Sequence, residues 1–150
     1  MDTQRPSIDE EQRLIVDELN SLGDVFGQYT YLLELSAQLP ALSEEEKSAC
    51  TLVGGCQSQV WLLVLKKDDG TVGIRADSDT LIVRGILSLM VSLLDGRTAC
   101  EIGAANIAFI EKTDLKAAFS DDRLNGFTSI CATIKTLSKT IANQEGDDRS

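Results

Sequence analysis

The chain has 150 residues, of which 43% are hydrophobic and 25% are charged; it contains no histidine and carries a formal net charge of −10. This composition is typical of one globular domain. The acidic balance argues against binding nucleic acid or anionic membranes, which requires clustered Lys and Arg. It permits attraction of a basic protein partner, although solubility is the simpler explanation. Without histidine, Ser–His and Cys–His nucleophilic pairs and histidine-ligated metal sites are excluded.

No targeting or membrane signal is evident. The first residues have no apolar signal core. Every long apolar run is interrupted by charge or glycine before it reaches membrane-spanning length. We therefore expect a cytoplasmic protein without a transmembrane helix.

Two helices are predicted in the first third of the chain. Ser7, followed three residues later by Glu10, forms a capping box that begins a helix ending near Leu22. A second helix is predicted over residues 25–39, and Pro40 ends it because the residue before a proline is pushed out of helical geometry. The side chains that we expect this helix to bury are Phe26, Tyr29, Leu32, Leu33 and Leu39. An acidic connection over residues 41–48 follows, with room for one helical turn.

A small antiparallel sheet of about three strands is predicted next. Its strands are expected at residues 51–53, 60–66 and 71–76. The last two are joined by a hairpin turn over residues 67–70, for which Asp69-Gly70 is the local signal.

The remainder is predicted to be helical. Asp77-Ser78-Asp79 supplies caps for a helix ending near Leu94, in which Gly85 indicates close packing of another backbone. Shorter helices are expected near residue 98 and over 114–119, and Ser120-Asp121-Asp122 caps a final helix. We expect a single α+β domain over residues 1–142 and a disordered tail over 143–150.

The segment with the most chemical information is Gly54-Gly55-Cys56, directly before the apolar strand. Two glycines allow a sharp, mobile turn, so the thiol of Cys56 is expected on a bent loop at one end of the sheet. The alternative is that Cys56 is a small buried hydrophobe, as free cysteines usually are. From the residues alone both interpretations stay open.

The other three cysteines are Cys50, Cys100 and Cys131. No two cysteines form a C-x-x-C pair, so neither a thioredoxin-like motif nor a zinc ribbon is indicated. In a reducing compartment they are expected as thiols. Cys100 and Cys131 have small and apolar neighbours and are expected in the core, whereas the role of Cys50, six residues before Cys56, stays open.

Several segments, in order and spacing, resemble the SufE-like sulfur-acceptor family, which includes the CsdE-type acceptors. The most specific is Gly55-Cys56-Gln57-Ser58-Gln59-Val60-Trp61. The others are residues 29–35 with 39–42, 77–79 with 82–86, and 123–127. The chain departs from the family pattern at Ala76, where glycine is expected, at Phe127, where leucine is common, and at Cys50.

The resemblance implies a SufE/IscU-like fold and a function. Cys56 would accept sulfur, as a persulfide, from a group II cysteine desulfurase of the SufS or CsdA type, stimulate that enzyme and deliver the sulfur to a scaffold that assembles iron–sulfur clusters. Pyridoxal phosphate belongs to the desulfurase, so the chain itself would be a sulfur-transfer accessory protein without a cofactor or a metal.

The resemblance also suggests supporting residues around Cys56. Gly54 and Gly55 would let the loop move, and Gln57 and Ser58 would position it. Arg123 is the candidate cation that stabilises the thiolate, with a surface arginine as the alternative.

Three further residues have a structural interpretation that we prefer. Asp77 and Asp79 are first of all helix caps, although the family match makes them candidates for controlling the loop. Trp61 is expected to pack in the core.

Three other functions remain as alternatives. An IscU-type scaffold would need three or four ligands converging on a cluster or a zinc ion. A stand-alone thiol enzyme such as a peroxidase would turn over its substrate without a partner protein. An interaction module would not depend on Cys56 at all.

Overall fold

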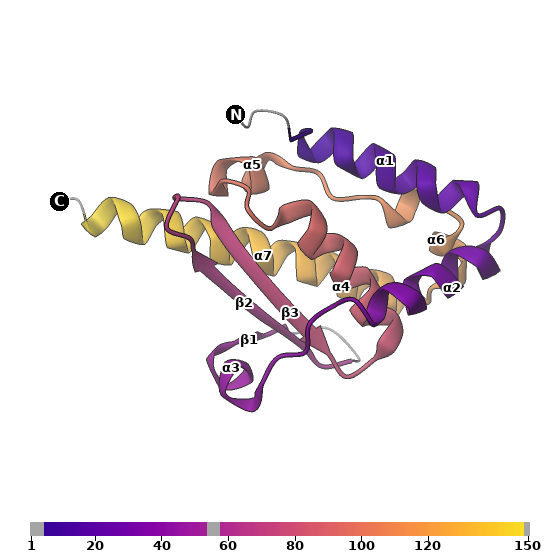
Figure 1. Cartoon of the computed structure of the whole chain (residues 1–150), viewed down its shortest axis with the longest axis horizontal. Helices are drawn as coiled ribbons and strands as arrows, with labels where there is room; N and C mark the ends of the chain where they lie inside the picture. Colours follow the sequence, from indigo (N-terminus) through magenta and orange to yellow (C-terminus); the bar gives the residue numbers. More distant parts are fainter. Residues whose placement is uncertain (1–4, 54–57, 149–150) are drawn as a thin grey trace.

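A computed structural model describes residues 5–53 and 58–148 of the chain. It has an α+β fold, as predicted: helices pack against a three-stranded antiparallel sheet (Figure 1). In chain order the elements are α1 (Ile8–Ser21), α2 (Val25–Ser36), α3 (Glu44–Ala49), β1 (Thr51–Leu52), β2 (Val60–Lys66), β3 (Val72–Ser78), α4 (Leu81–Leu94), α5 (Ala99–Ala104), the 3-10 helix η1 (Ile110–Lys112), α6 (Leu115–Ala118) and α7 (Asp121–Asp148).

The sheet has the order β1-β2-β3, and its main hairpin pairs β2 with β3 from Val60↔Ser78 to Lys66↔Val72. The turn between them ends at Gly70, whose φ of 88° is easily adopted only by glycine. The outer edge of β3 is also occupied, because Val72 exchanges hydrogen bonds with the 96–97 backbone and Asp95 Oδ1 accepts from Ile74 N at 2.8 Å. This edge therefore offers few free groups to another strand.

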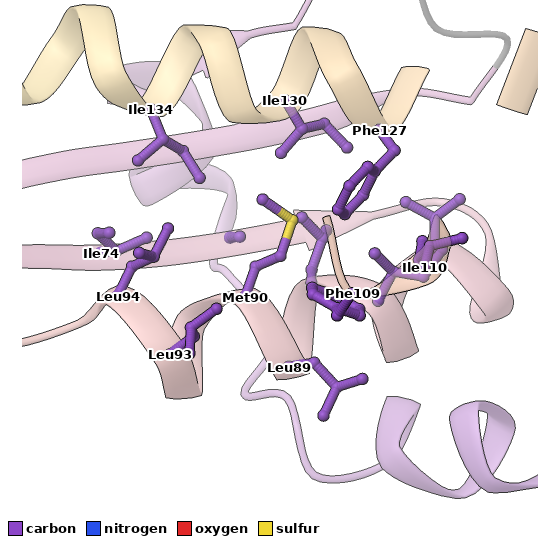
Figure 2. Packing of buried hydrophobic residues seen from close by; sticks show 14 of the residues in the cluster. Ile74, Leu89, Met90, Leu93, Leu94, Phe109, Ile110, Phe127, Ile130 and Ile134 are labelled. Carbon is purple, nitrogen blue, oxygen red and sulfur yellow. The ribbon is translucent and has the colours of Figure 1, made fainter. Parts of the chain in front are cut away.

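The core lies between the sheet, α4 and α7. Figure 2 shows Met90 and Leu94 of α4 facing Ile130 and Ile134 of α7. Nearby, the rings of Phe109 and Phe127 meet edge to face at 5.3 Å between centroids. Helix α4 is apolar on nearly all sides because α2, β3 and α1 together leave little of it exposed.

Local sequence signals set most helix ends. The capping box of Ser7 and Glu10 is present, and equivalent boxes begin α3 and α5. Gly23, with φ at 93°, follows α1 as expected. The second helix ends at Ser36, three residues earlier than predicted, and β3 extends to Ser78, so that α4 begins only at Leu81.

Several burial predictions were wrong. Phe26, Tyr29 and Leu33 are exposed, because α2 turns its other side, with Gln28 and Leu32, toward the core. Leu32 and Leu39 are buried as predicted.

Trp61 and Cys100 also lie outside the core. Trp61 is half-buried on the outer face of the sheet, where the ammonium of Lys47 lies 4.3 Å from its ring centroid. Cys100 is exposed on α5.

Helix α7 continues to Asp148, past residue 143, where we expected a disordered tail to begin.

The contact between α2 and α4 depends on Gly85. A Cβ atom at this position would lie 2.7 Å from the carbonyl carbon of Leu32 and closer still to its oxygen. Because both atoms belong to the backbone of α2, no side-chain rotation relieves the overlap. The two helices approach this closely only with glycine at residue 85.

Replacing Gly85 with alanine is therefore expected to lower the free energy of unfolding by about 3 kcal/mol, in the range of strongly overpacked cores. Gly103→Ala is the matched control, because a Cβ there meets nothing within 4 Å; it should leave stability unchanged or raise it by up to about 1 kcal/mol. Urea unfolding measures both variants. Equal stabilities for the two would contradict the close approach.

Candidate functional site

The segment that follows the cysteine motif is held by the end of β3. Beyond the last ladder pair, Gln59 N donates to Asp79 Oδ1 at 3.1 Å, and Asp79 N donates to Gln59 O at 3.3 Å. The hydroxyl of Ser78 also donates to Gln59 O at 2.7 Å. Thr80 Oγ1 lies 2.7 Å from Ser58 Oγ and 3.1 Å from Asp79 Oδ1. Residues 58–59 are thus tied to residues 78–80 by main-chain and side-chain bonds.

The predicted capping role of Asp77 and Asp79 is wrong. The N-cap of α4 is Thr80, and it makes no side-chain capping bond. Asp79 instead accepts the hydrogen bond from Gln59 N, which places it beside the cysteine motif. The prediction failed because β3 extends further than its apolar pattern indicates, so these residues belong to the strand and the turn after it.

Asp77 is buried at the end of β3 and pairs with Arg84 of α4. Its Oδ2 also accepts from Leu42 N at 3.1 Å. The guanidinium of Arg84 also donates to the carbonyl oxygens of Ser36, the last residue of α2, and of Leu39, three residues further on. The Asp77–Arg84 ion pair therefore joins β3, α4 and the end of α2. The guanidinium of Arg84 also supplies hydrogen-bond donors to carbonyl oxygens at that helix end.

A small cavity of about 30 Å³ opens beside Ser58. Its walls come from Ser58 and the start of β2, from α4 and from the first turns of α7. The lining residues are Ser58, Val60, Val83, Ile86, Asp122, Arg123, Gly126, Phe127 and Ile130. Most of this surface is apolar, and the polar groups lie on the side of Ser58 and the start of α7.

Arg123 is the cation at this cavity. It lies in the first turn of α7, where its backbone N donates to Ser120 Oγ at 3.2 Å. Its Nη1 atom is buried and has no hydrogen-bond partner among the residues that the structure describes. A buried guanidinium nitrogen without an acceptor is unfavourable unless it faces a group that needs it.

Of the predicted site residues, the structure brings Ser58 and Arg123 together at one cavity and places Asp79 next to Ser58 through Thr80. Asp77 lies behind them, in the ion pair with Arg84. Gly54, Gly55, Cys56 and Gln57 lie outside the described residues.

Sequence reasoning missed Thr80 and Arg84. The hydroxyl of Thr80 bonds the cysteine segment, and a threonine directly after two aspartates gave no separate signal. Arg84 did carry a signal, because it is the single charged residue within the apolar run of α4. A charge in such a run needs a buried partner.

The remaining cysteines differ in accessibility. Burial raises the pKa of the half-buried Cys50 thiol, and the Glu46 carboxylate adds to this effect. Burial also raises the pKa of Cys131, on α7, to about 12. Since the thiolate is the reactive form, both are poorer nucleophiles than an unperturbed cysteine.

No group of three or more Cys, Asp or Glu side chains that would hold a metal ion is found within residues 5–53 and 58–148. In the same part of the chain, none of the helices has the length and apolar character needed to cross a membrane.

The fold and the site define a small α+β protein with a cysteine motif between β1 and β2 and a cavity beside it. Residues 13–138 match the family model SufE, described as an Fe–S metabolism associated domain. The chain belongs to the SufE family, as its motifs had suggested.

Curated relatives agree with this assignment, and a solved structure shares the fold. The chain is 31% identical over 115 residues to sulfur acceptor protein CsdE of Escherichia coli (strain K12), covering 76% of this chain and 78% of the relative. It is 36% identical over 132 residues to an uncharacterized SufE-like protein of Synechocystis, covering 88% and 81%. The solution structure of a hypothetical protein from Thermus thermophilus has the same fold, with a TM-score of 0.74 at 16% identity, covering 89% of this chain and 96% of that one.

Asp79→Ala is expected to loosen the segment after the cysteine motif, because it removes the acceptor for Gln59 N. One hydrogen bond contributes about 1 kcal/mol, so exchange of the Gln59 amide hydrogen should accelerate about fivefold. Asp69→Ala is the control: Asp69 makes the same kind of bonds, to the N and Oγ1 of Thr71, at the opposite end of the hairpin. Unchanged exchange at Gln59 in Asp79→Ala would show that other bonds hold this segment.

Cys131 is expected to resist alkylation in the folded protein. With its pKa raised to about 12, only a minute fraction is thiolate at pH 8, whereas Cys100 is exposed. Timed treatment with N-ethylmaleimide followed by peptide mass spectrometry should show Cys100 modified well before Cys131. In urea the two rates should converge. Equal rates in the native protein would contradict the burial of Cys131.

Proposed function

We propose that this chain is a sulfur acceptor: Cys56 receives sulfane sulfur from a cysteine desulfurase and carries it toward iron–sulfur cluster assembly. The observation that supports this most strongly is the cavity beside Ser58, with the buried, unpartnered Nη1 of Arg123 at it. Family membership and the similarity to a relative named as a sulfur acceptor support the same function.

The transfer is an exchange between a thiol and a persulfide. The Cys56 thiolate attacks the terminal sulfur of the persulfide on the desulfurase cysteine. A new S–S bond forms to Cys56, the S–S bond of the donor breaks, and the donor cysteine leaves as a thiolate. One thiolate and one persulfide are present before and after the step, so no external oxidant or reductant is required.

Arg123 is assigned to the stabilisation of negative charge on Cys56. The chain has no histidine, so the activating charge must come from elsewhere. Among the residues lining the cavity, Arg123 is the one cation, and its Nη1 atom has no other partner in the described part of the chain. A guanidinium beside a thiolate lowers the thiol pKa and keeps its own charge at any working pH.

The cavity is assigned to the protection of the persulfide. Its volume of about 30 Å³ suits a group about the size of one water molecule or one sulfur atom. Apolar walls from Val83, Ile86 and Phe127 would exclude water and soluble thiols that reduce a persulfide. The loop glycines Gly54 and Gly55 would let Cys56 leave the cavity when the desulfurase docks.

We further propose that Ser58, Asp79 and Gln57 position the loop, that Asp77 supports it through Arg84, and that docking stimulates the desulfurase. Removal of sulfur from the donor cysteine frees that enzyme for its next turnover, which gives the stimulation a chemical cause. Cys50 is not assigned as the acceptor, because burial raises its pKa.

The test is the intact mass of the protein after incubation with a group II cysteine desulfurase and L-cysteine without reductant. The wild-type chain should gain about 32 Da per transferred sulfur, reversibly on addition of dithiothreitol, and Cys56→Ser should not. Cys50→Ser is the matched control and should load normally. A gain that survives in Cys56→Ser would move the acceptor to another thiol. No gain with any such enzyme would refute the sulfur-acceptor function, and a metal titration would then test the IscU-type scaffold.

A further inference from the structure

Three large apolar side chains lie together on the solvent side of α2. The exposed fractions are 77% for Phe26, 38% for Tyr29 and 38% for Leu33. Their spacing of three and four residues puts them along one side of the helix, so they form a continuous stripe. We call these three residues the α2 stripe. Grouped apolar side chains at a surface mark interaction sites, whereas single ones do not.

The α2 stripe borders a hollow between α2 and α6. This hollow has a volume of about 370 Å³, and its lining residues are Asp24, Val25, Asp114, Ala117 and Ala118. Tyr29 joins the two features, since its ring meets that of Phe119, just after α6, at 6.3 Å between centroids. An exposed Phe26 near a hollow lined partly by alanines is the kind of surface to which a partner binds through apolar anchor residues.

The same surface continues toward the cavity beside Ser58. Phe119 is followed by Ser120, which accepts the hydrogen bond from Arg123 N, and Arg123 lines the cavity. Figure 1 shows α2, α6 and the first turns of α7 at one end of the molecule. A protein seated on the α2 stripe and extending over the start of α7 would therefore reach the mouth of that cavity.

The charge around this surface is mainly negative. Exposed carboxylates come from Glu34 on α2, from Asp24 and Asp114 at the hollow and from Asp121 at the start of α7, while Lys116 is the nearby cation on α6. The whole chain has a formal net charge of −10. A second copy would bring the same charges and be repelled, so the complementary occupant is a surface with apolar anchors among Lys and Arg.

We propose that the α2 stripe and the adjoining hollow dock the cysteine desulfurase, through apolar side chains that are flanked by basic residues. This proposal rests on the sulfur-acceptor function, because it assigns a surface to the donor of that function. Recognition would then extend beyond the cysteine loop to a face along α2. From Phe26 to Leu33 this face is about 10 Å long, calculated from the rise per residue of an α-helix.

The test compares Phe26→Glu with Leu14→Glu. Both residues are exposed on helices, Leu14 at 60%, but Leu14 lies on α1, outside the stripe. Phe26→Glu should raise the Kd for the desulfurase at least about tenfold, and Leu14→Glu should leave it unchanged. At saturating desulfurase Phe26→Glu should still gain one sulfur on Cys56, because the transfer residues are intact. Circular dichroism and the unfolding midpoint confirm that both variants fold.

Two further variants test the details. Leu33→Glu should weaken binding like Phe26→Glu. Asp114→Asn should reduce the salt dependence of the affinity, because it removes one carboxylate from the hollow.

The outcomes separate this proposal from the function on which it rests. If wild type is loaded with sulfur and Phe26→Glu binds the desulfurase equally well, the docking surface is refuted and the sulfur-acceptor function stands. If the wild-type chain neither binds the desulfurase nor gains sulfur, both the docking surface and the sulfur-acceptor function are refuted. If Phe26→Glu instead abolishes a dimer of the chain alone, seen by sedimentation equilibrium, the occupant is a second copy and the proposal is overturned.

Discussion

The close contact between α2 and α4 is the constraint on which the rest of the structure depends. Gly85 lets the backbones meet, and the neighbouring Arg84 donates to carbonyl oxygens at and just after the end of α2 and pairs with the carboxylate of Asp77. A buried charge pair is tolerated because each partner is also hydrogen-bonded to the backbone. Helix packing and the end of β3 are therefore fixed by the same two adjacent residues.

That arrangement sets the position of the site. With Asp77 held, β3 is fixed up to the turn at residues 78–80, and this turn binds Ser58 and Gln59. Helix α4 begins directly afterwards, so Val83 and Ile86 face the cavity from one side while α7 closes the other. The segment after the cysteine motif is thus attached to the place where β3 and α4 meet.

The sequence predicts those features that neighbouring residues determine and misses those that depend on distant packing. The Ser7–Glu10 capping box and the Asp69-Gly70 turn act locally, so their patterns were sufficient. Gly85 was recognised because a glycine inside an apolar helix is itself a signal of close packing, although its partner on α2 was not predicted. The exposed side of α2 was not predictable, because this helix has apolar residues all around and only tertiary contacts choose between Leu32 and Leu33. Asp77 was misassigned for a related reason: its partner Arg84 becomes its neighbour only when strand and helix fold together. Arg123 and Ser58 are far apart in sequence, and the family motif rather than periodicity linked them.

A carrier of reactive sulfur has two opposed requirements. Its thiol must be ionised to accept sulfur, and the product must be hidden from water and other thiols. A cysteine packed against the core meets only the second, as the raised pKa of the partly buried Cys131 illustrates. An exposed cysteine, such as Cys100, does not meet the second requirement, because solvent and other thiols reach it freely. In the function proposed for Cys56, a thiol that moves between the apolar cavity at Arg123 and the desulfurase would meet both requirements in turn, provided that docking of the partner triggers the movement. Recognition at a surface separate from the thiol, as proposed for α2, would supply that signal, because binding energy gained there can be used to open the loop.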